Sequence, residues 1–227
     1  MFIVGYNSNH STSKATRKRQ KKERLGEERL NNQGCLMKVV EYDKTESIVV
    51  EFQDKYKAKV ITRYNEFAKG KVKNPYYPNV YGGMIGNKYS AKVNGKISKE
   101  YFTWKNMLVD CCNQDVLCCD EWKLFDNFYE WLHEQENFEQ FLNGIRWTIS
   151  KDIIKNNNIY SQNTCFLVSQ KVKRLFMKHK LNTDVSENVL QAYKEYMESK
   201  IKRVAREEFA DGNITEECYK AMMNYKM

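Results

Sequence analysis

The chain has 227 residues, a hydrophobic fraction of 41%, and 38 Lys and Arg against 29 Asp and Glu, which gives a formal net charge of +9. Domains usually run to about 100–150 residues, so the length allows one sizeable core or two small ones, and the apolar content excludes a chain that is disordered throughout. The excess of cations attracts polyanions, so nucleic acid is the natural partner, although a merely soluble basic protein also fits the charge.

The sequence carries no sign of a membrane span or of secretion. No apolar run approaches the roughly 20 residues that a span needs, and Met1 to His10 lack the order of charged, apolar and small residues of a signal peptide. We therefore expect a cytoplasmic protein. Seven Cys in such a chain predict reduced thiols rather than a disulfide framework.

Residues 1–24 are polar and end in a dense run of cations. The run comprises Lys14, Arg17, Lys18, Arg19, Lys21, Lys22 and Arg24. Such a block repels itself, which favours an arm that orders on a polyanion. A solvated helix start that feeds Leu25 to Leu30 is an equally good interpretation, and the two are compatible.

Residues 25–97 predict a small antiparallel β module. Apolar and β-branched patterns indicate strands at Leu36–Val40, Ile48–Phe52 and Ala58–Thr62, with a turn at Asp43–Thr45. A β-ribbon of this size fits a major groove, but a half-buried sheet packed on its neighbour is favoured.

The centre of the chain, residues 98–180, predicts two helices and then a hairpin. Aromatic and apolar residues recur at helical spacing from Tyr101 to Leu108 and again from Trp122 to Leu132. Residues 145–154 are typical of a strand. The cluster Asn156–Asn158 predicts a turn, after which Ile159-Tyr160 returns as the second strand of the hairpin. A basic face with an apolar back follows, with Lys171, Lys173 and Arg174 as its cations.

Residues 181–227 predict two helices. The apolar period from Val189 to Val204 sets the first, the stretch Ala210–Asn213 breaks it, and Thr215-Glu216-Glu217 opens the second.

Several segments in collinear order then carry a resemblance. In the first half they are Arg24 to Gly34, Met37-Lys38, Val49 to Val60, Asn74 to Gly82, Trp104 to Leu108, and Cys119 to Trp122 with Phe125 and Phe128. In the second half they are Lys151-Asp152-Ile153, Ile159-Tyr160-Ser161, Thr164 to Val168, Leu175-Phe176 and Tyr219-Lys220-Ala221. Together they resemble a family of phage and prophage proteins, common in Gram-positive hosts, that are labelled HNH-endonuclease-like or plant-transcription-factor-like DNA-binding proteins. The resemblance implies DNA binding and a relation to the HNH fold, a β-hairpin and helix that normally hold one divalent metal.

The chain departs from the HNH pattern at the residues that cut DNA. In HNH enzymes a His at the end of the first hairpin strand is the general base, and a carboxylate or second His beside it holds the metal. The corresponding stretch is Ser150-Lys151-Asp152, and no His occurs from residue 134 to 178. Lys151 could contact phosphate and Asp152 could hold Mg²⁺ through water, but a lone carboxylate is weak evidence for a metal site. We therefore expect no catalytic residue, no metal and no cofactor.

The pairs Cys111-Cys112 and Cys118-Cys119 invite a zinc interpretation, because four thiolates make a closed tetrahedral site. Adjacent pairs on a helical period do not converge as CxxC knuckles do, so buried reduced thiols are favoured. The remaining cysteines, Cys35, Cys165 and Cys218, are interpreted as core residues.

The sequence thus predicts an α+β protein with a basic arm (1–24), a small antiparallel β module (25–97), an HNH-like central α/β-hairpin module (98–180) and a helical C-terminal tail (181–227). The expected function is phage-type binding of nucleic acid in the cytoplasm of a bacterial host, with duplex DNA as the favoured ligand, although the sequence does not separate DNA from RNA. The expected contacts are Lys14, Arg17, Lys18, Arg19, Lys21, Lys22, Arg24, Lys151, Lys171, Lys173 and Arg174. Two alternatives stay open: an inhibitor that binds a host defence complex such as a CRISPR effector, and an active metal-dependent endonuclease.

Overall fold

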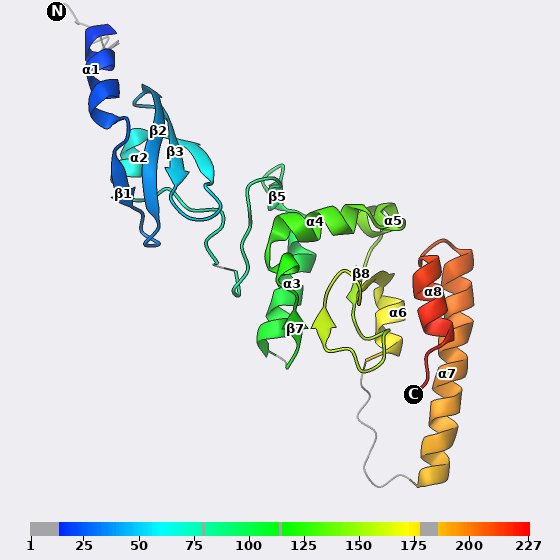
Figure 1. The fold of residues 1–227 in the computed structure, drawn as a ribbon. Coiled ribbons are helices and arrows are strands. Elements are labelled where there is room, and N and C mark those ends of the chain that lie inside the picture. Colours follow the sequence, from blue (N-terminus) through cyan, green and yellow to red (C-terminus); the bar gives the residue numbers. More distant parts are fainter. Residues whose placement is uncertain (1–13, 79, 114, 178–185) are drawn as a thin grey trace, which may run out of the picture. The chain divides into compact units, whose positions relative to one another are not determined.

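The structure is a computed structural model that describes residues 14–78, 80–113, 115–177 and 186–227. The chain divides into two compact units, residues 1–77 and 78–227. The architecture is α+β, as predicted: the first unit holds an antiparallel four-stranded sheet, and the second holds helices around short strands (Figure 1). None of the helices in the described ranges combines the length and the apolar character that a bilayer crossing requires.

The first unit is a meander of four strands with one helix before it and one after it. The sheet order follows the chain: β1 (Glu28–Leu30), β2 (Leu36–Lys44), β3 (Ser47–Phe52) and β4 (Lys59–Thr62). Helix α1 (Lys14–Arg24) precedes the sheet, and α2 (Tyr64–Ala68) follows it. The three predicted strands are confirmed, while β1 and α2 are additions that the sequence pattern did not indicate.

A β-bulge in β2 keeps apolar side chains on the covered face of this sheet. Met37 and Val39 point inward, and the next inward residue is Tyr42 rather than Glu41, because the register with β3 shifts between Val39 and Glu41. An extra residue in one strand changes the phase of its alternation in this way. The strand continues to Lys44, so the turn lies at residues 45–46 rather than at residues 43–45 as predicted. The resulting core comprises Met37, Val39, Tyr42, Ile48, Val50, Phe52, Ala58, Phe67 and Val72.

The predicted basic arm is a helix over its described residues. Helix α1 ends at Arg24, a turn with Gly26 at φ 83° follows, and β1 begins at Glu28, so the helix does not run on through residues 25–30. Residues 1–13 lie outside the described part of the chain, as do the side chains of Lys14 and Arg17.

The first half of the second unit is helical and has an aromatic core. A short hairpin of β5 (Lys92–Val93) and β6 (Lys96–Ile97) leads into α3 (Lys99–Asn113). The 3-10 turn η1 (Glu121–Lys123), α4 (Phe125–His133) and α5 (Phe138–Asn143) follow. The two predicted helices are confirmed as α3 and α4, and they enclose the fully buried side chains of Trp104, Trp122, Phe125, Phe128 and Leu132.

The predicted hairpin is wrong in its second strand. Strand β8 (Trp147–Ser150) pairs antiparallel with β10 (Phe166–Ser169), not with Ile159-Tyr160. Residues Ile159–Tyr160 form β9, which pairs in parallel with β7 (Leu117–Cys118). Strand β8 ends at Ser150, and the next residues form a turn. Asn157 stabilises this turn, because its Nδ2 donates to the carbonyls of Lys151 and Ile159, both at 3.0 Å.

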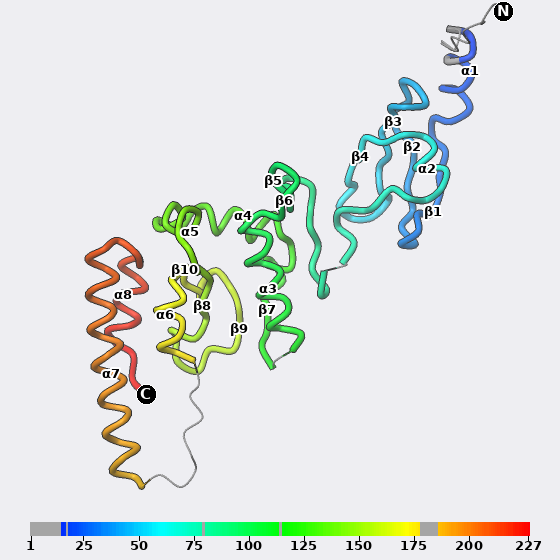
Figure 2. The backbone as a smooth tube through the Cα atoms, turned by 180° about the vertical axis from the view of Figure 1, so that it is seen from behind, coloured from blue at the N-terminus to red at the C-terminus, as the bar shows by residue number. Residues whose placement is uncertain are grey.

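The ribbon of β8 and β10 separates two cores. Ile149 and Leu167 pack into the aromatic core, while Val168 belongs to a second core on the opposite face. This second core is formed with α6 (Gln170–Leu175), α7 (Glu187–Ala210) and α8 (Glu216–Met223). Helix α8 lies against the C-terminal half of α7 (Figures 1 and 2), which confirms the two predicted C-terminal helices.

One buried carboxylate fixes the segment before the β5–β6 hairpin. Asp126 of α4 is 3% exposed and accepts backbone N–H groups from Asn87 (3.0 Å), Lys88 (3.2 Å) and Tyr89 (3.1 Å). The close approach explains Gly86, where a Cβ atom would lie 2.0 Å from Asp126 Oδ2. Three donors therefore depend on a single side chain.

We predict that Asp126→Ala destabilises the second unit by about 1–3 kcal/mol, because three part-buried backbone N–H groups lose their shared acceptor. All four Trp residues lie in this unit, so tryptophan fluorescence during urea unfolding reports its stability. The matched control is Asp120→Ala, which removes an exposed carboxylate and is expected to leave the midpoint unchanged. Equal midpoints for the two variants would contradict the anchoring role of Asp126.

Candidate nucleic-acid interface

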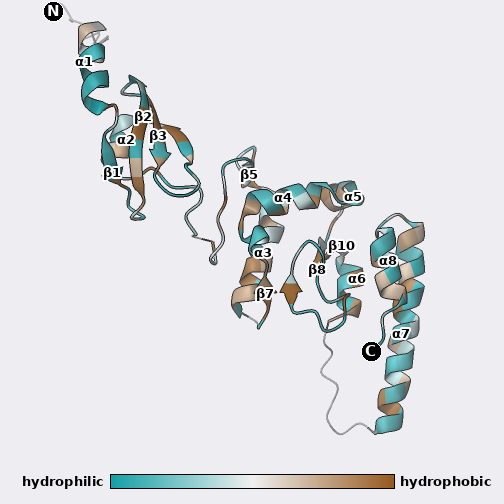
Figure 3. Ribbon diagram, in the orientation of Figure 1, coloured by the Kyte–Doolittle hydropathy of each residue, from teal (hydrophilic) through white to brown (hydrophobic). Residues whose placement is uncertain are grey.

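Helix α1 is the most strongly charged element of the described chain. Its 11 residues include seven Lys or Arg and one acid, Glu23. Lys18, Lys21 and Lys22 are exposed and form no ion pair with a described residue, whereas Arg19 lies 3.7 Å from Glu23 one turn later. Figure 3 shows the helix as mostly hydrophilic, in contrast to the apolar residues within the strands of the sheet. The helix thus offers cations to solvent rather than to a core.

One cation of α1 has a structural role instead. The guanidinium of Arg24 lies 3.8 Å from the ring centroid of Tyr64 and donates to the hydroxyl of Tyr42 at 2.8 Å. The same hydroxyl donates to Gln20 at 3.3 Å. These contacts join the last turn of α1 to β2 and α2, so the other cations of the helix are presented from a fixed base.

The charge of the whole chain is concentrated in the first unit. Residues 1–77 contain 17 Lys and Arg against nine Asp and Glu, a net charge of +8. Residues 78–227 contain 21 Lys and Arg against 20 Asp and Glu, a net charge of +1. A polyanion that is attracted by net charge is therefore attracted to the first unit.

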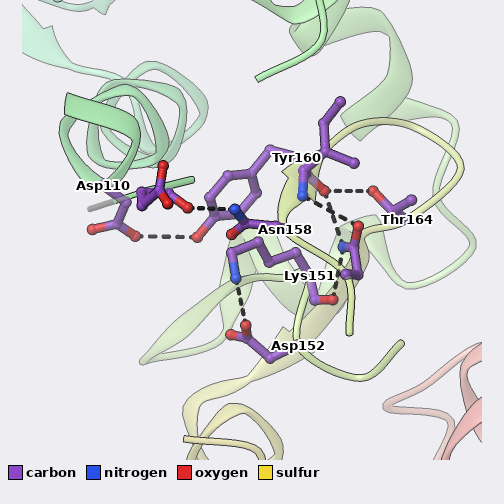
Figure 4. A network of polar contacts seen from close by, with 9 residues as sticks. Asp110, Lys151, Asp152, Asn158, Tyr160 and Thr164 are labelled. Carbon is purple, nitrogen blue, oxygen red and sulfur yellow. Dashed lines mark hydrogen bonds and ion pairs between the residues drawn. The ribbon is translucent and has the colours of Figure 1, made fainter. Parts of the chain in front are cut away.

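The second unit has a polar pocket of about 490 Å³ beside the end of β8. Three carboxylates and two ammonium groups line it together with an amide and apolar side chains. Figure 4 shows Asp110, Lys151, Asp152, Asn158 and Tyr160 of this lining. The lining comprises Asp110, Asp115, Val116, Lys151, Asp152, Asn158, Tyr160, Lys173, Phe176 and Met177. Of the cations predicted to contact nucleic acid, the structure brings Lys151 and Lys173 together here.

The charged groups of this pocket are largely paired. The hydroxyl of Tyr160 donates to Asp110 Oδ2 at 3.1 Å, and Lys151 Nζ donates to Asp152 Oδ1 at 2.6 Å (Figure 4). Burial, and then the negative charge of Asp110, raise the pKa of the Tyr160 phenol well above its ordinary value, so this phenol stays a donor. The side chain of Lys151 is 11% exposed and lies 5.8 Å from the Tyr160 ring centroid.

Backbone contacts of the loop before β9 hold the pocket's rim. Asn158 Nδ2 donates to the carbonyl of Asp115, and the hydroxyl of Thr164 donates to the carbonyl of Ile159 at 2.7 Å (Figure 4). The backbone N–H of Leu117 donates to the carbonyl of Asn158 at 2.8 Å. These bonds connect β7, β9 and the turn at residues 161–164 into one wall.

The three cations predicted on α6 have different surroundings. Lys171 lies 2.7 Å from Glu208 and 3.6 Å from Glu207 of α7, so it joins two helices. Lys173 faces the pocket, and Arg174 is exposed; neither forms an ion pair with a described residue. Sequence reasoning missed Asp110 and Asp115 as pocket residues, because the end of α3 and the residues after it lie about 40 positions from Lys151 and no local pattern connects them.

The described residues contain no group of three or more His, Cys, Asp or Glu that could hold a metal ion. All seven cysteines are free thiols; Cys165 and Cys218 are buried, as expected of core residues, and Cys35 is half-buried. Comparison with protein-family models, with curated proteins and with solved structures found no match for this chain.

We predict that Arg24→Ala loosens α1 from the sheet. Loss of the hydrogen bond to Tyr42 and of the close cation–π contact with Tyr64 costs about 1–2 kcal/mol, so amide protection of α1 against hydrogen exchange falls about fivefold to thirtyfold. The control is Lys22→Ala, which removes an exposed cation of the same helix. Arg24→Lys is also expected to lose protection, because an ammonium does not reproduce the planar stacking. Unchanged protection in Arg24→Ala would show that another contact holds the helix.

Proposed function

We propose that this chain binds nucleic acid, and duplex DNA in particular, through its phosphates, with α1 as the main contact. The observation that carries the proposal is the run of seven cations in 11 residues, of which Arg24 is anchored and Lys18, Lys21 and Lys22 are exposed. A helix of this length is about 16 Å long, enough to lie along several phosphates of one strand. Each phosphate that a cation neutralises releases a counterion, which supplies affinity without regard to sequence.

In this proposal the second unit does not cut the DNA. The resemblance to HNH enzymes matches the general base to the stretch Ser150-Lys151-Asp152, which contains no His. The side chain of Ser150 is fully buried and has no hydrogen-bond partner among the described residues. A serine hydroxyl is a poor base at neutral pH. A divalent ion at Asp152 would compete with the Lys151 ammonium, which lies 2.6 Å from the carboxylate.

The first test is a salt titration of DNA binding by the full chain and by the triple variant Lys18→Gln, Lys21→Gln, Lys22→Gln. We expect the variant to lose about tenfold or more in affinity at moderate salt. The slope of log K against log salt should fall by about 2–3, since about one counterion is released per phosphate contact.

The matched control is Lys92→Gln, Lys96→Gln, Lys155→Gln, which removes the same charge from exposed positions of the second unit. It should bind nearly as the unaltered chain does. Equal losses in both triple variants would reduce the proposal to attraction by net charge alone. Absence of binding by the full chain would overturn it and direct the search to a protein partner, and cleavage in a parallel reaction with Mg²⁺ would contradict the non-cutting part.

A second prediction distinguishes a cation of α6 that contacts DNA from one that stabilises the fold. We expect Lys173→Gln to weaken DNA binding severalfold with unchanged stability, because Lys173 lines the pocket and forms no ion pair with the described residues. Lys171→Gln should instead lower the unfolding midpoint, because it leaves Glu208, whose side chain is 6% exposed, without its partner. Tryptophan fluorescence and the binding titration give both readouts. The reverse pattern would show that Lys171 is the contact residue.

A further inference from the structure

Two surface turns of the first unit are bonded to each other. The first turn, residues 53–57, connects β3 to β4, and the second, residues 73–77, ends the unit after α2. Asn74 Nδ2 donates to Asp54 Oδ2 at 2.6 Å, so a side chain of one turn holds a side chain of the other. Segments about 20 positions apart in the sequence therefore form one continuous surface.

This surface carries a stacked pair of tyrosines. The ring centroids of Tyr56 and Tyr76 lie 4.3 Å apart, and the ring planes make an angle of 11°. The backbone N–H of Tyr56 donates to Asp54 Oδ1 at 2.9 Å, and that of Tyr76 donates to Asn74 Oδ1 at 3.0 Å, so both rings follow closed turns. Tyr76 is half-buried and packs against the core of the sheet, whereas Tyr56 is exposed. The core thus anchors one ring, and that ring holds the other at the surface.

One face of the Tyr56 ring is left for a ligand. Among the described residues no ring other than Tyr76 stacks on it. The ammonium of Lys55 lies 4.9 Å from the centroid of the Tyr56 ring. A cation–π contact at an exposed site is weak, and Lys55 is an exposed, flexible side chain, so a flat ligand can displace it.

The charges around the tyrosines favour an anionic ligand. The two turns and the residues before the second turn present four exposed cations that form no ion pair with a described residue: Lys55, Lys57, Lys71 and Lys73. The only carboxylate in residues 53–57 and 71–77 is Asp54, and its two oxygens already accept hydrogen bonds from the turns. A held aromatic ring among cations suits a ligand that is flat and polyanionic.

Single-stranded nucleic acid has this combination of properties. Its unpaired bases expose their π-faces, which stack on aromatic side chains with little regard to sequence, and its phosphates are attracted to Lys. A duplex hides the faces of its bases by stacking them on one another. The tyrosine surface therefore favours an unpaired strand over a duplex.

The tyrosine surface is separate from the base of α1. Arg24 contacts Tyr42 and Tyr64 beside the turn that precedes β3, whereas the tyrosine surface begins in the turn that follows β3 (Figure 1). Strand β3 has six residues and so places roughly 20 Å between the two turns. One unit thus offers two distinct surfaces with unpaired cations.

We propose that Tyr56, supported by Tyr76, is a stacking platform for an unpaired base of nucleic acid, and that Lys55 and Lys73 contact the phosphates beside that base. The site rests on the proposed function only in that its ligand is a nucleic acid. It adds a second surface and a second form of ligand, a single strand, to the binding of duplex DNA by α1.

The test is a titration of the full chain into a thymidine oligonucleotide that carries one 2-aminopurine, a base whose emission falls when it stacks on a ring. We expect the emission to fall as the strand binds. Binding of the strand with unchanged emission would overturn the platform. This measurement uses the unaltered chain, so it does not depend on the folding of a variant.

Variants then identify the ring. Tyr56→Ala should lose about fivefold to a hundredfold in affinity for the strand, together with the change in emission, because a base loses its stacking partner. Tyr56→Phe keeps the ring and should bind as the unaltered chain does. The matched control is Tyr196→Ala, which removes an exposed tyrosine that has a cation 5.8 Å from its centroid but no stacked ring among the described residues. Full binding by Tyr56→Ala, or equal losses in Tyr56→Ala and Tyr56→Phe, would contradict the proposal.

A parallel titration with blunt duplex DNA separates this site from α1. Tyr56→Ala should bind the duplex as the unaltered chain does, while Lys55→Gln, Lys73→Gln should lower the salt dependence of single-strand binding. Binding of the strand without binding of the duplex would remove the duplex proposal and leave the platform. Binding of the duplex, with no effect of Tyr56→Ala on the strand, would do the opposite.

Discussion

The second unit depends on a two-stranded ribbon that is buried on both faces. The pairing of β8 with β10 places Ile149 and Leu167 in the aromatic core and Val168 in the core formed with α6, α7 and α8. A ribbon between two cores has little freedom to twist or slip, because a shift of one residue exchanges the side chains of the two faces. This constraint positions the residues that follow the two strands. Lys151 and Asp152 come directly after β8, α6 comes directly after β10, and the pocket lies beside these strand ends.

The cations of the chain fall into two groups that composition does not distinguish. Arg24, Lys151 and Lys171 are engaged by a tyrosine pair, by Asp152, and by Glu207 and Glu208 respectively. Lys18, Lys21, Lys22 and Lys173 form no ion pair with a described residue. A cation that already has a partner in the protein would have to give up that interaction in order to bind a phosphate. A cation without such a partner loses only side-chain entropy when it binds a phosphate.

Much of the fold could be predicted from sequence, for physical reasons that are visible in particular residues. The strand of Ile48 to Phe52 and the helix from Tyr101 to Leu108 have clear periods, because each buries one face against a single core. The partner of β8 could not be predicted in this way. Phe166 to Val168 is buried on both faces, so it shows no alternation, and the choice between it and Ile159-Tyr160 is made by the Asn157 turn and by β7.

The pocket residues were harder still to predict, because they meet only through tertiary structure. Asp110 and Tyr160 are 50 positions apart, and the bond between them exists because β7 pairs with β9 next to the end of α3. The charge run of α1, by contrast, needs no tertiary information. What the sequence could not indicate is that Arg24 departs from the run: its role depends on Tyr42 facing inward, which in turn depends on the bulge at Val40.

The balance of charge in the pocket limits what it would contribute to the proposed binding of nucleic acid. Three carboxylates face two ammonium groups, and Lys151 is already 2.6 Å from Asp152, so a phosphate that approaches Lys173 also approaches Asp110 and Asp115. Such a site would affect the orientation of a nucleic-acid backbone more than its affinity. Attraction of a phosphate to the ammonium of Lys173 is offset by repulsion from the neighbouring carboxylates. Long-range attraction then comes almost wholly from the first unit with its net charge of +8. In the proposed complex, the second unit would therefore act on a nucleic acid through the shape of this pocket and of the wall that holds Tyr160.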